Sequence, residues 1–252
     1  MTATLGGLYQ IEPLGEHKIF IFECCSSTMD EGWRLFKEGL LQTGDSVLAY
    51  SQTRGRGQLG RKWLSKKGNL YVSWLEKSFW FGNRLIPLKV GLLLAKALQK
   101  KSLPIRLKWP NDLILDTRKV GGILVEEKLD YFLIGLGLNL RQSPSLLELD
   151  KEGLFLPGDL SNFLPEQEPL AFWKELYLEY KNSSEELKGS REFIQELNQT
   201  LAFQGKEVVV QDGQKVIQGK MLGIGENGEL QLVQETDIIN IYAGSIVQVL
   251  DT

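Results

Sequence analysis

One segment contains the densest set of groups able to bind an anion: Arg54–Trp63, which reads R-G-R-G-Q-L-G-R-K-W. Its glycines allow backbone N–H groups to point into one concavity and allow a ligand to approach the chain closely. Its cations, which are Arg54, Arg56, Arg61 and Lys62, can pair with a phosphate or a carboxylate. The segment therefore predicts an anion-binding loop, and the simpler interpretation is a solvated basic turn.

Two general phosphate-binding motifs overlap this loop, and the residues around it exclude both. Gly55, Gly57 and Gly60 spell G-x-G-x-x-G, but a dinucleotide-binding fingerprint requires a helix directly after its last glycine. The chain continues instead with a turn at 66–69 and a strand-like run at 70–74. A Walker loop would need Gly-Lys followed by serine or threonine, and here Gly60 is followed by Arg-Lys-Trp.

The overall composition is that of an ordinary globular protein, with 252 residues, 42% hydrophobic content and a formal net charge of -3. This charge argues against a broad nucleic-acid-binding surface, so an anion site must be local. The sequence contains no secretory signal and no apolar run long enough to cross a bilayer, so we predict a cytoplasmic protein without membrane contact.

The histidine and cysteine content excludes several classes of chemistry. The single histidine, His17, argues against zinc catalysis and against a Ser-His-Asp triad, and we expect it at the surface. The only cysteines, Cys24 and Cys25, are adjacent, so we expect buried, reduced thiols and no disulfide framework. A metal site here would use oxygen ligands, which favours magnesium held by carboxylate and substrate phosphate.

Hydrophobic periodicity predicts an α+β fold that positions these groups. We expect strands at 19–22, 45–51, 70–76, 105–109, 113–115, 119–126 and 131–140, and helices at 29–36, 85–101, 169–187 and 191–201. Ser27 or Thr28 can cap the first helix. Gly135 and Gly137 lie on one face of their strand, where a ligand or another backbone can come close. After Phe203, four short strands separated by glycine turns predict a small antiparallel barrel.

Four motifs stand in order along the chain: GRGQLGRKW at 55–63, KWPNDL at 108–113, KVGGILVE at 119–126 and GLGLN at 135–139. In this order and at these separations, they resemble the biotin protein ligases. The resemblance covers essentially the whole chain, because that family also ends in a small SH3-like barrel. It implies a mixed-sheet catalytic domain of the biotin/lipoate ligase type at 1–202 and a small C-terminal barrel domain at 203–252.

The resemblance has two departures. The family usually shows Ser-Thr-Asn before its first helix, and this chain has Met29 in place of the amide. The family's middle arginine of the glycine loop is Gln58 here. Some members also carry an N-terminal DNA-binding domain, for which we expect no room before Ser27, so the resemblance disfavours a repressor.

The activity that the resemblance implies is activation of biotin by ATP to biotinyl-5′-AMP, followed by transfer to a lysine of a biotin carboxyl carrier protein. Magnesium would accompany ATP, no DNA would be involved, and a homodimer is left open. The first step brings two anions together, so cations that stabilise transition-state charge can catalyse it without histidine.

The matching positions receive roles from the same resemblance. Arg56, Lys119 and Asp112 would be catalytic, with Asp112 orienting the metal or accepting the acceptor's proton. The residues expected to bind biotin are Ser27, Thr28, Gln52, Gly55, Arg56, Gly57, Trp63, Lys119, Gly122 and Gly135. Those expected to serve ATP and magnesium are Arg56, Arg61, Lys108, Asn111, Lys119 and Asn139, with Asp112 as a candidate metal ligand.

Simpler interpretations and two rival functions remain open. The hydroxyls of Ser27 and Thr28 could be plain helix caps, Asn111 and Asp112 a plain turn, and Lys119 a solvent-facing hairpin residue. One rival function is a lipoate ligase of the same fold. The other is a binding or regulatory protein that holds biotinyl-AMP without transferring it.

Overall fold

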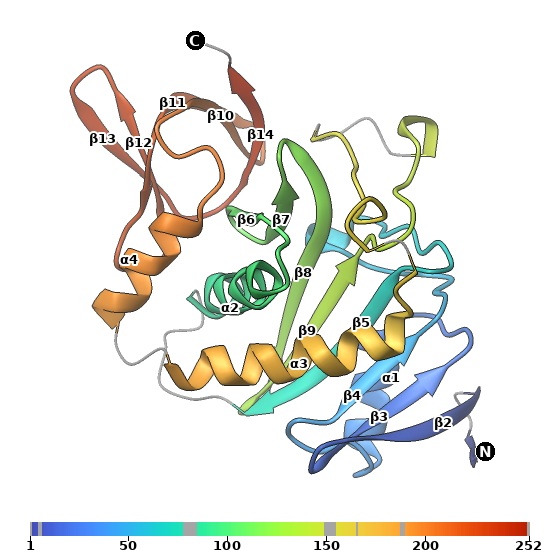
Figure 1. The fold of residues 1–252 in the computed structure, drawn as a ribbon. Helices are drawn as coiled ribbons and strands as arrows, with labels where there is room; N and C mark the ends of the chain where they lie inside the picture. Colours follow the sequence, from blue (N-terminus) through green and yellow to red (C-terminus); the bar gives the residue numbers. More distant parts are fainter. Residues whose placement is uncertain are drawn as a thin grey trace. The chain divides into compact units, whose positions relative to one another are not determined.

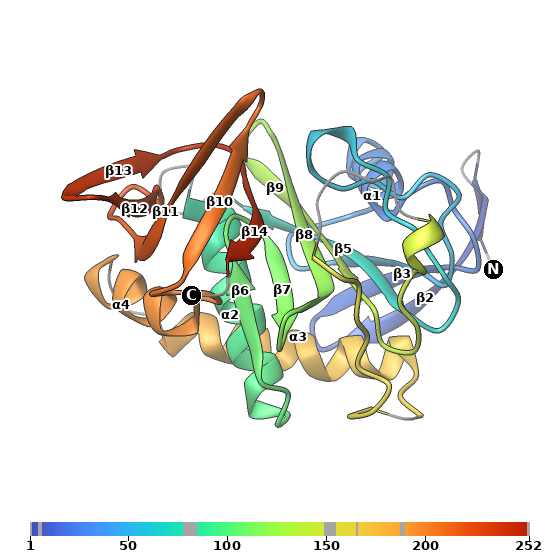
Figure 2. The ribbon, with the colours of Figure 1, turned by 90° about the horizontal axis from the view of Figure 1, so that it is seen from above.

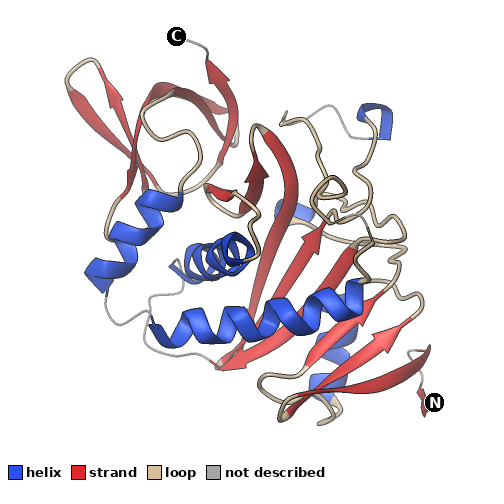
Figure 3. Cartoon of the chain, viewed as in Figure 1, coloured by secondary structure: helices blue, strands red, loops and turns tan. Residues whose placement is uncertain are grey.

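The computed structural model describes residues 2–4, 7–77, 85–148, 155–164, 166–186 and 190–250. The chain forms two compact units that alternate along the sequence. The first unit comprises Met1–Trp80, Val120–Pro144 and Gly158–Tyr177, and the second comprises Phe81–Lys119, Ser145–Pro157 and Leu178–Thr252. Helices, strands and loops of both are distinguished in Figure 3.

A mixed sheet forms the first unit, with strands in the order β1-β2-β3-β4-β5-β9-β8. These strands are β1 Thr2–Thr4, β2 Gly7–Leu14, β3 His17–Phe22, β4 Ser46–Ala49, β5 Leu70–Lys77, β8 Arg118–Lys128 and β9 Tyr131–Leu138. Strands β3 and β4 are parallel, and the other neighbours in this order are antiparallel. The glycine loop connects β4 to β5, as predicted.

Two helices cover opposite faces of this sheet (Figure 1). On β5, the Ser73 hydroxyl bonds to Thr28 of α1, Thr28–Lys37. The next residue, Trp74, packs against Trp173 of α3, Pro169–Glu186, with 5.1 Å between ring centroids. Because successive side chains of a strand point to opposite faces, α1 and the first half of α3 lie on different sides.

The second unit combines two complete helices, the end of α3, a hairpin and a small sheet. Its elements are α2 Ile86–Lys100, β6 Ile105–Lys108, β7 Asp112–Leu115, α4 Ser190–Thr200, β10 Glu207–Asp212, β11 Lys215–Ile224, β12 Leu230–Gln234, β13 Asp237–Ile241 and β14 Ser245–Leu250. Strands β10 to β14 form an antiparallel sheet in the order β13-β12-β11-β10-β14, which is visible from above in Figure 2. The predicted α+β class with a C-terminal antiparallel sheet is therefore confirmed, and closure of this sheet into a barrel stays a prediction.

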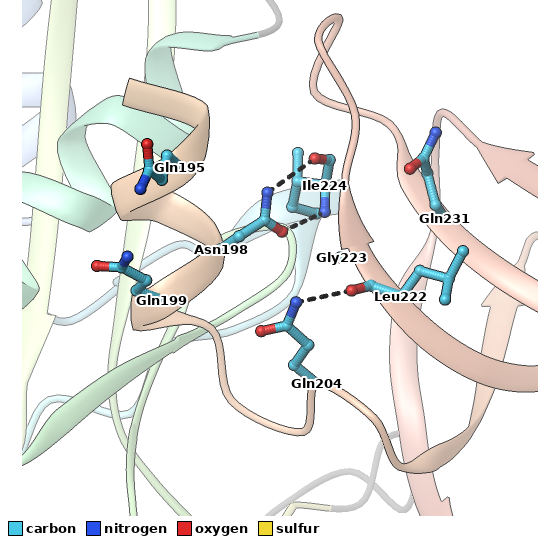
Figure 4. A pocket seen from close by; sticks show the side chains of 8 residues that line it. All are labelled: Gln195, Asn198, Gln199, Gln204, Leu222, Gly223, Ile224 and Gln231. Atoms are coloured by element: carbon cyan, nitrogen blue, oxygen red, sulfur yellow. Dashed lines mark hydrogen bonds between the residues drawn. The ribbon is translucent and has the colours of Figure 1, made fainter. Parts of the chain in front are cut away.

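An asparagine fastens α4 to this sheet (Figure 4). The Asn198 amide donates to the carbonyl of Ile224 at 3.0 Å and accepts from the Ile224 N–H at 2.7 Å. Gly223 provides the space, because a Cβ there would overlap the Asn198 side chain. The adjacent polar recess is lined by Gln195, Asn198, Gln199, Gln204, Leu222, Gly223, Ile224 and Gln231.

Several expectations differ from the structure. Strands β1, β2 and β14 were not predicted. His17, expected at the surface, is half-buried in β3 with its ring edge against Tyr177. Only Cys25 is buried, whereas its neighbour Cys24, in the bend that follows β3, is exposed. The end of the helix predicted at 169–187 lies outside the described residues.

Candidate active site

The glycine loop is a short hairpin closed by a 3-10 turn, Gln58–Gly60. The N–H of Trp63 donates to the carbonyl of Gly55 at 2.9 Å, and the N–H of Gly57 donates to that of Arg61 at 2.7 Å. Gly55 is required at the neck, because a Cβ there would lie 2.6 Å from the Trp63 carbonyl oxygen. The loop is therefore held by its own backbone between two strands, which suits a binding element.

Arg56 is tied to α1 and β8 by two carboxylates. Its guanidinium lies 2.7 Å from Oδ1 of Asp30 and 3.3 Å from Oε1 of Glu126. Glu126 is oriented in turn, because its Oε2 accepts a hydrogen bond from Nε1 of Trp33 at 2.8 Å. These half-exposed pairs contribute little stability, so an incoming anion can compete for the guanidinium at low cost.

Beside the loop lies a group of hydrogen-bonded polar side chains, which we call the hydroxyl cluster: Thr28, Gln52, Ser65 and Ser73. The Oε1 atom of Gln52 accepts from the N–H of Thr28 at 2.8 Å, and its Nε2 donates to Oγ of Ser65 at 2.9 Å. Ser73 donates to Oγ1 of Thr28 at 2.7 Å. Ser27 instead caps α1, accepting from the N–H of Met29 at 3.3 Å.

Ser65 and Ser73 were not among the predicted residues. Ser73 had a signal in the sequence, since it is the only hydroxyl in the apolar run Leu70–Leu75 apart from the phenol of Tyr71. A buried hydroxyl in such a strand needs a partner, and its partner here is Thr28. No signal in the sequence pointed to Ser65, because its hydrogen bond with Gln52 depends on the path that the loop takes in the fold.

The glycines of β9 face protein side chains. A Cβ on Gly135 would lie 2.8 Å from the sulfur of Met29, and one on Gly137 would lie 2.5 Å from the Trp63 indole. Gly122 on β8 is the cross-strand partner of Gly137. The neighbours at Gly135 and Gly137 are therefore the side chains of Met29 and Trp63, not the ligand or the backbone that was expected, and approach of a ligand to Gly135 or Gly122 stays a prediction.

Asn139 lies at the end of β9 and is 3% exposed. Its Nδ2 donates to the carbonyl of Gly158 at 2.9 Å, and its own N–H donates to that of Val120 at 2.8 Å. Its Oδ1 atom is buried without a hydrogen-bond partner among the described residues. A buried acceptor of this kind suits a ligand that brings a donor or a cation.

In the second unit, Lys108, Asp112 and Lys119 form what we call the lysine–aspartate cluster. Register pairs Lys108 of β6 with Asp112 of β7. The Lys108 ammonium lies 2.8 Å from Oδ2 of Asp112, and that of Lys119 lies 2.6 Å from Oδ1. Burial alone would raise the pKa of Asp112, but the two ammonium groups outweigh it and lower the pKa to about 2.

This depressed pKa gives a prediction for stability against pH. The folded-state pKa lies below the ordinary value of 3.8, so ionised Asp112 stabilises the fold, and this contribution is lost as pH falls from about 4 to 2. The free energy of unfolding in urea should be higher for the wild type than for Asp112→Asn at about pH 4, and this difference should shrink by about 2 kcal/mol as the pH falls to about 2. The core variant Leu113→Ala is the control, and its deficit should stay constant. A constant deficit for Asp112→Asn would contradict the prediction.

The remaining predicted residues are placed as follows. Arg61 is exposed on the glycine loop, and Asn111 is buried in the turn between β6 and β7. In the first unit, the hydroxyl cluster lies beside the glycine loop. In the second unit, both lysines of the lysine–aspartate cluster contact its aspartate. Among the described residues, no group of three or more His, Cys, Asp or Glu side chains could hold a metal ion by itself.

Two protein families match the chain. The Biotin/lipoate A/B protein ligase family matches residues 21–139, and the Biotin protein ligase C terminal domain matches residues 203–247. The two matches together take in well over half of the sequence. None of the described helices is both long enough and apolar enough to cross a membrane.

Individual proteins agree with these matches. The chain is 40% identical over 118 residues to the bifunctional ligase/repressor BirA of Escherichia coli, covering 40% of this chain and 35% of that protein. It is 31% identical over 110 residues to the biotin--[acetyl-CoA-carboxylase] ligase of Paracoccus denitrificans, covering 39% and 45% respectively. The matched part is thus less than half of either relative.

A solved structure matches over nearly its whole length. The biotin protein ligase of Aquifex aeolicus in complex with biotin and ATP has 29% sequence identity and a TM-score of 0.76 to this chain. The match covers 93% of this chain and 99% of that one.

Proposed function

Because this chain belongs to the biotin/lipoate A/B protein ligase family and carries the C-terminal domain of biotin protein ligases, we propose that it attaches biotin to a protein. The substrates are biotin and ATP, and the acceptor is a lysine of a biotin carboxyl carrier protein. Support for the acceptor comes from the Paracoccus relative, whose name contains acetyl-CoA carboxylase.

In the first step, an oxygen of the biotin carboxylate attacks the α-phosphorus of ATP, and pyrophosphate leaves. Both reactants are anions, so the barrier falls when fixed cations lie where the charge concentrates. Lys119 supplies such a cation, because its ammonium is oriented by Asp112 and its side chain is one-third exposed. Arg56 supplies a second cation when its guanidinium leaves Asp30 and Glu126 and pairs with the ligand.

In the second step, the neutral amine of the carrier lysine attacks the biotinyl carbonyl, and AMP leaves. The proton of the amine must be lost during this step, since a lysine with a reference pKa of about 10.4 is mostly protonated. Asp112 is a poor acceptor for it, because its pKa is lowered to about 2. We therefore assign Asp112 to orienting Lys119.

Magnesium fits this arrangement as an ion carried by ATP. The ion would neutralise phosphate charge, which is its usual role in phosphoryl and nucleotidyl transfer. The oxygens that this chain could add are those of Asp112, each already paired with a lysine, and Oδ1 of Asn139, which lacks a partner among the described residues. The same Oδ1 could instead accept from a nucleotide amino group.

Biotin recognition is assigned to the first unit. The hydroxyl cluster offers acceptors and donors that suit a polar ring, while Met29 and Trp63 offer apolar surface against β9. This combination of a few placed polar groups and an apolar wall is typical of small-molecule sites.

The observation that carries the proposal is the oriented ammonium of Lys119, held 2.6 Å from a buried carboxylate. The test is release of pyrophosphate on mixing the protein with biotin and ATP, followed by labelling of a carrier domain. Release without labelling would favour a protein that holds biotinyl-AMP without transferring it. Release with lipoate and not with biotin would favour a lipoate ligase.

Gln58 gives a prediction about retention of biotinyl-AMP. An arginine at this half-buried position would add a cation to the loop, so Gln58→Arg should slow escape of the adenylate about fivefold, or roughly 1 kcal/mol. Escape is measured by labelling of a lysine-rich bystander protein at matched adenylation rates. The control is Leu59→Arg, which adds the same charge at the exposed tip of the turn. Equal bystander labelling by Gln58→Arg and the wild type would show that Gln58 does not reach the phosphate.

We also propose a cytoplasmic location and no DNA partner, in keeping with the net charge of -3. A homodimer remains a proposal to be tested by the mass in solution. The division into a catalytic domain at 1–202 and a small domain at 203–252 is proposed as a functional division. The second family match lies wholly within the latter range.

A further inference from the structure

Lys108 is a buried lysine whose ammonium is surrounded by acceptors of the second unit. Its side chain is 2% exposed. Besides Asp112 at 2.8 Å, the ammonium reaches Oγ of Ser245 at 3.3 Å and the carbonyl of Ile246 at 3.1 Å. The ring of Phe155 lies 4.9 Å from it, measured to the centroid. An ammonium has three hydrogens to donate, and three acceptors of the second unit lie within 3.3 Å of this one.

The backbone on both sides of Lys108 is also fixed to the C-terminal part of the chain. The carbonyl of Leu107 accepts from the N–H of Ala202 at 2.9 Å. Nε1 of Trp109 donates to the carbonyl of Gly228 at 3.2 Å. Leu107, Lys108 and Trp109 are therefore all hydrogen-bonded to residues that follow α4. These contacts fix the position of the Lys108 ammonium.

The two lysines of the lysine–aspartate cluster differ in exposure. Lys108 engages Oδ2 of Asp112 from the buried side, while Lys119, which is 33% exposed, engages Oδ1. With one oxygen fixed, the carboxylate cannot rotate freely, and the direction of the other oxygen is set. Lys119 then has a defined acceptor for its own ammonium.

We propose that Lys108 is a positioning residue, which fixes Asp112 through Oδ2 so that Oδ1 holds the Lys119 ammonium, and which links this arrangement to β14. The inference rests on the proposed function for the role of Lys119. It differs from the expectation that Lys108 serves ATP. A phosphate contact by Lys108 would take its ammonium away from the buried Oδ2 of Asp112 and from the carbonyl of Ile246, which is unfavourable.

The first experiment measures unfolding by urea and does not depend on activity. The variants are Lys108→Met, Asp112→Asn and the double variant. Lys108→Met leaves a buried carboxylate short of one partner, so we expect a large loss of stability that the added Asp112→Asn partly restores. The matched control is Lys96→Met, which breaks the pair of Lys96 with Glu196 at 2.6 Å. Its loss should be additive with Asp112→Asn.

The second experiment measures adenylate formation. Lys108→Met should lower kcat at least tenfold and leave the KM for ATP within twofold, because the residue acts through Asp112 and not on the nucleotide. In an Asp112→Asn background, Lys108→Met should have no further effect. Lys96→Met should behave as the wild type does. A raised KM for ATP with unchanged kcat, or an equal loss in both backgrounds, would overturn the inference.

A second variant covers the case in which Lys108→Met does not fold. Ser245→Ala removes one acceptor only and should lower kcat at least twofold without raising the KM for ATP. Unchanged kcat would overturn the link to β14. If the wild type forms no adenylate, the proposed function fails. The unfolding experiment still decides the inference. A stability loss in the double variant that is smaller than the sum of the two single losses supports it, and a loss equal to that sum overturns it.

Discussion

Replacement of Lys119 by alanine should reduce adenylate formation at least a hundredfold and leave the fold intact. The lost cation neutralises charge in a transition state formed from two anions, and such a contact is worth about 3 kcal/mol. The stability cost should be below about 1 kcal/mol, because the pair with Asp112 is partly exposed at Lys119 and Lys108 still balances the carboxylate. Pyrophosphate release and urea unfolding measure the two effects separately.

The neighbouring cation provides the control for this experiment. Arg118 is exposed and donates to the carbonyl of Pro157 at 3.3 Å, so Arg118→Ala removes one positive charge from the same strand. It should leave the rate of adenylate formation unchanged. A rate for Lys119→Ala above about a tenth of that of the wild type would show that Lys119 does not act on the reacting anions.

The elements that periodicity could define were predicted close to their observed bounds. The helix α1, for example, was expected at 29–36 and spans Thr28–Lys37. Two of the missed strands were missed for different reasons. Strand β2 contains Pro13, which weakens a strand signal, and β14 gains its place by pairing with β10, more than thirty residues earlier.

For the candidate site, the motifs supplied residue types but not their partners. The sequence identified Arg56 as a cation for an anion, and the fold pairs it with Asp30 and Glu126. It placed Lys108 with the nucleotide, and the fold surrounds it with acceptors that include Ser245, 137 positions away. Contacts between such distant segments follow from tertiary packing, which local patterns do not encode.

The contact between Gly137 and Trp63 gives the second large expected effect. A Cβ at residue 137 would lie between 2.5 and 2.7 Å from three atoms of the indole. The ring is rigid, so Gly137→Ala should displace it and lower the free energy of unfolding by about 1–3 kcal/mol. Under the proposed function Trp63 forms a wall of the biotin site, so we expect biotin binding to weaken at least tenfold in calorimetric titration.

Two further variants separate this effect from a general disturbance of the first unit. Gly32→Ala is the control, because its Cβ would meet the flexible end of Leu133 at 2.8 Å and alanine favours a helix, so its cost should be smaller. In a Trp63→Leu background the overlapping indole atoms are absent, and Gly137→Ala should then cost little further stability. If Gly137→Ala is destabilised yet binds biotin as tightly as the wild type does, Trp63 packs on β9 without contacting the ligand.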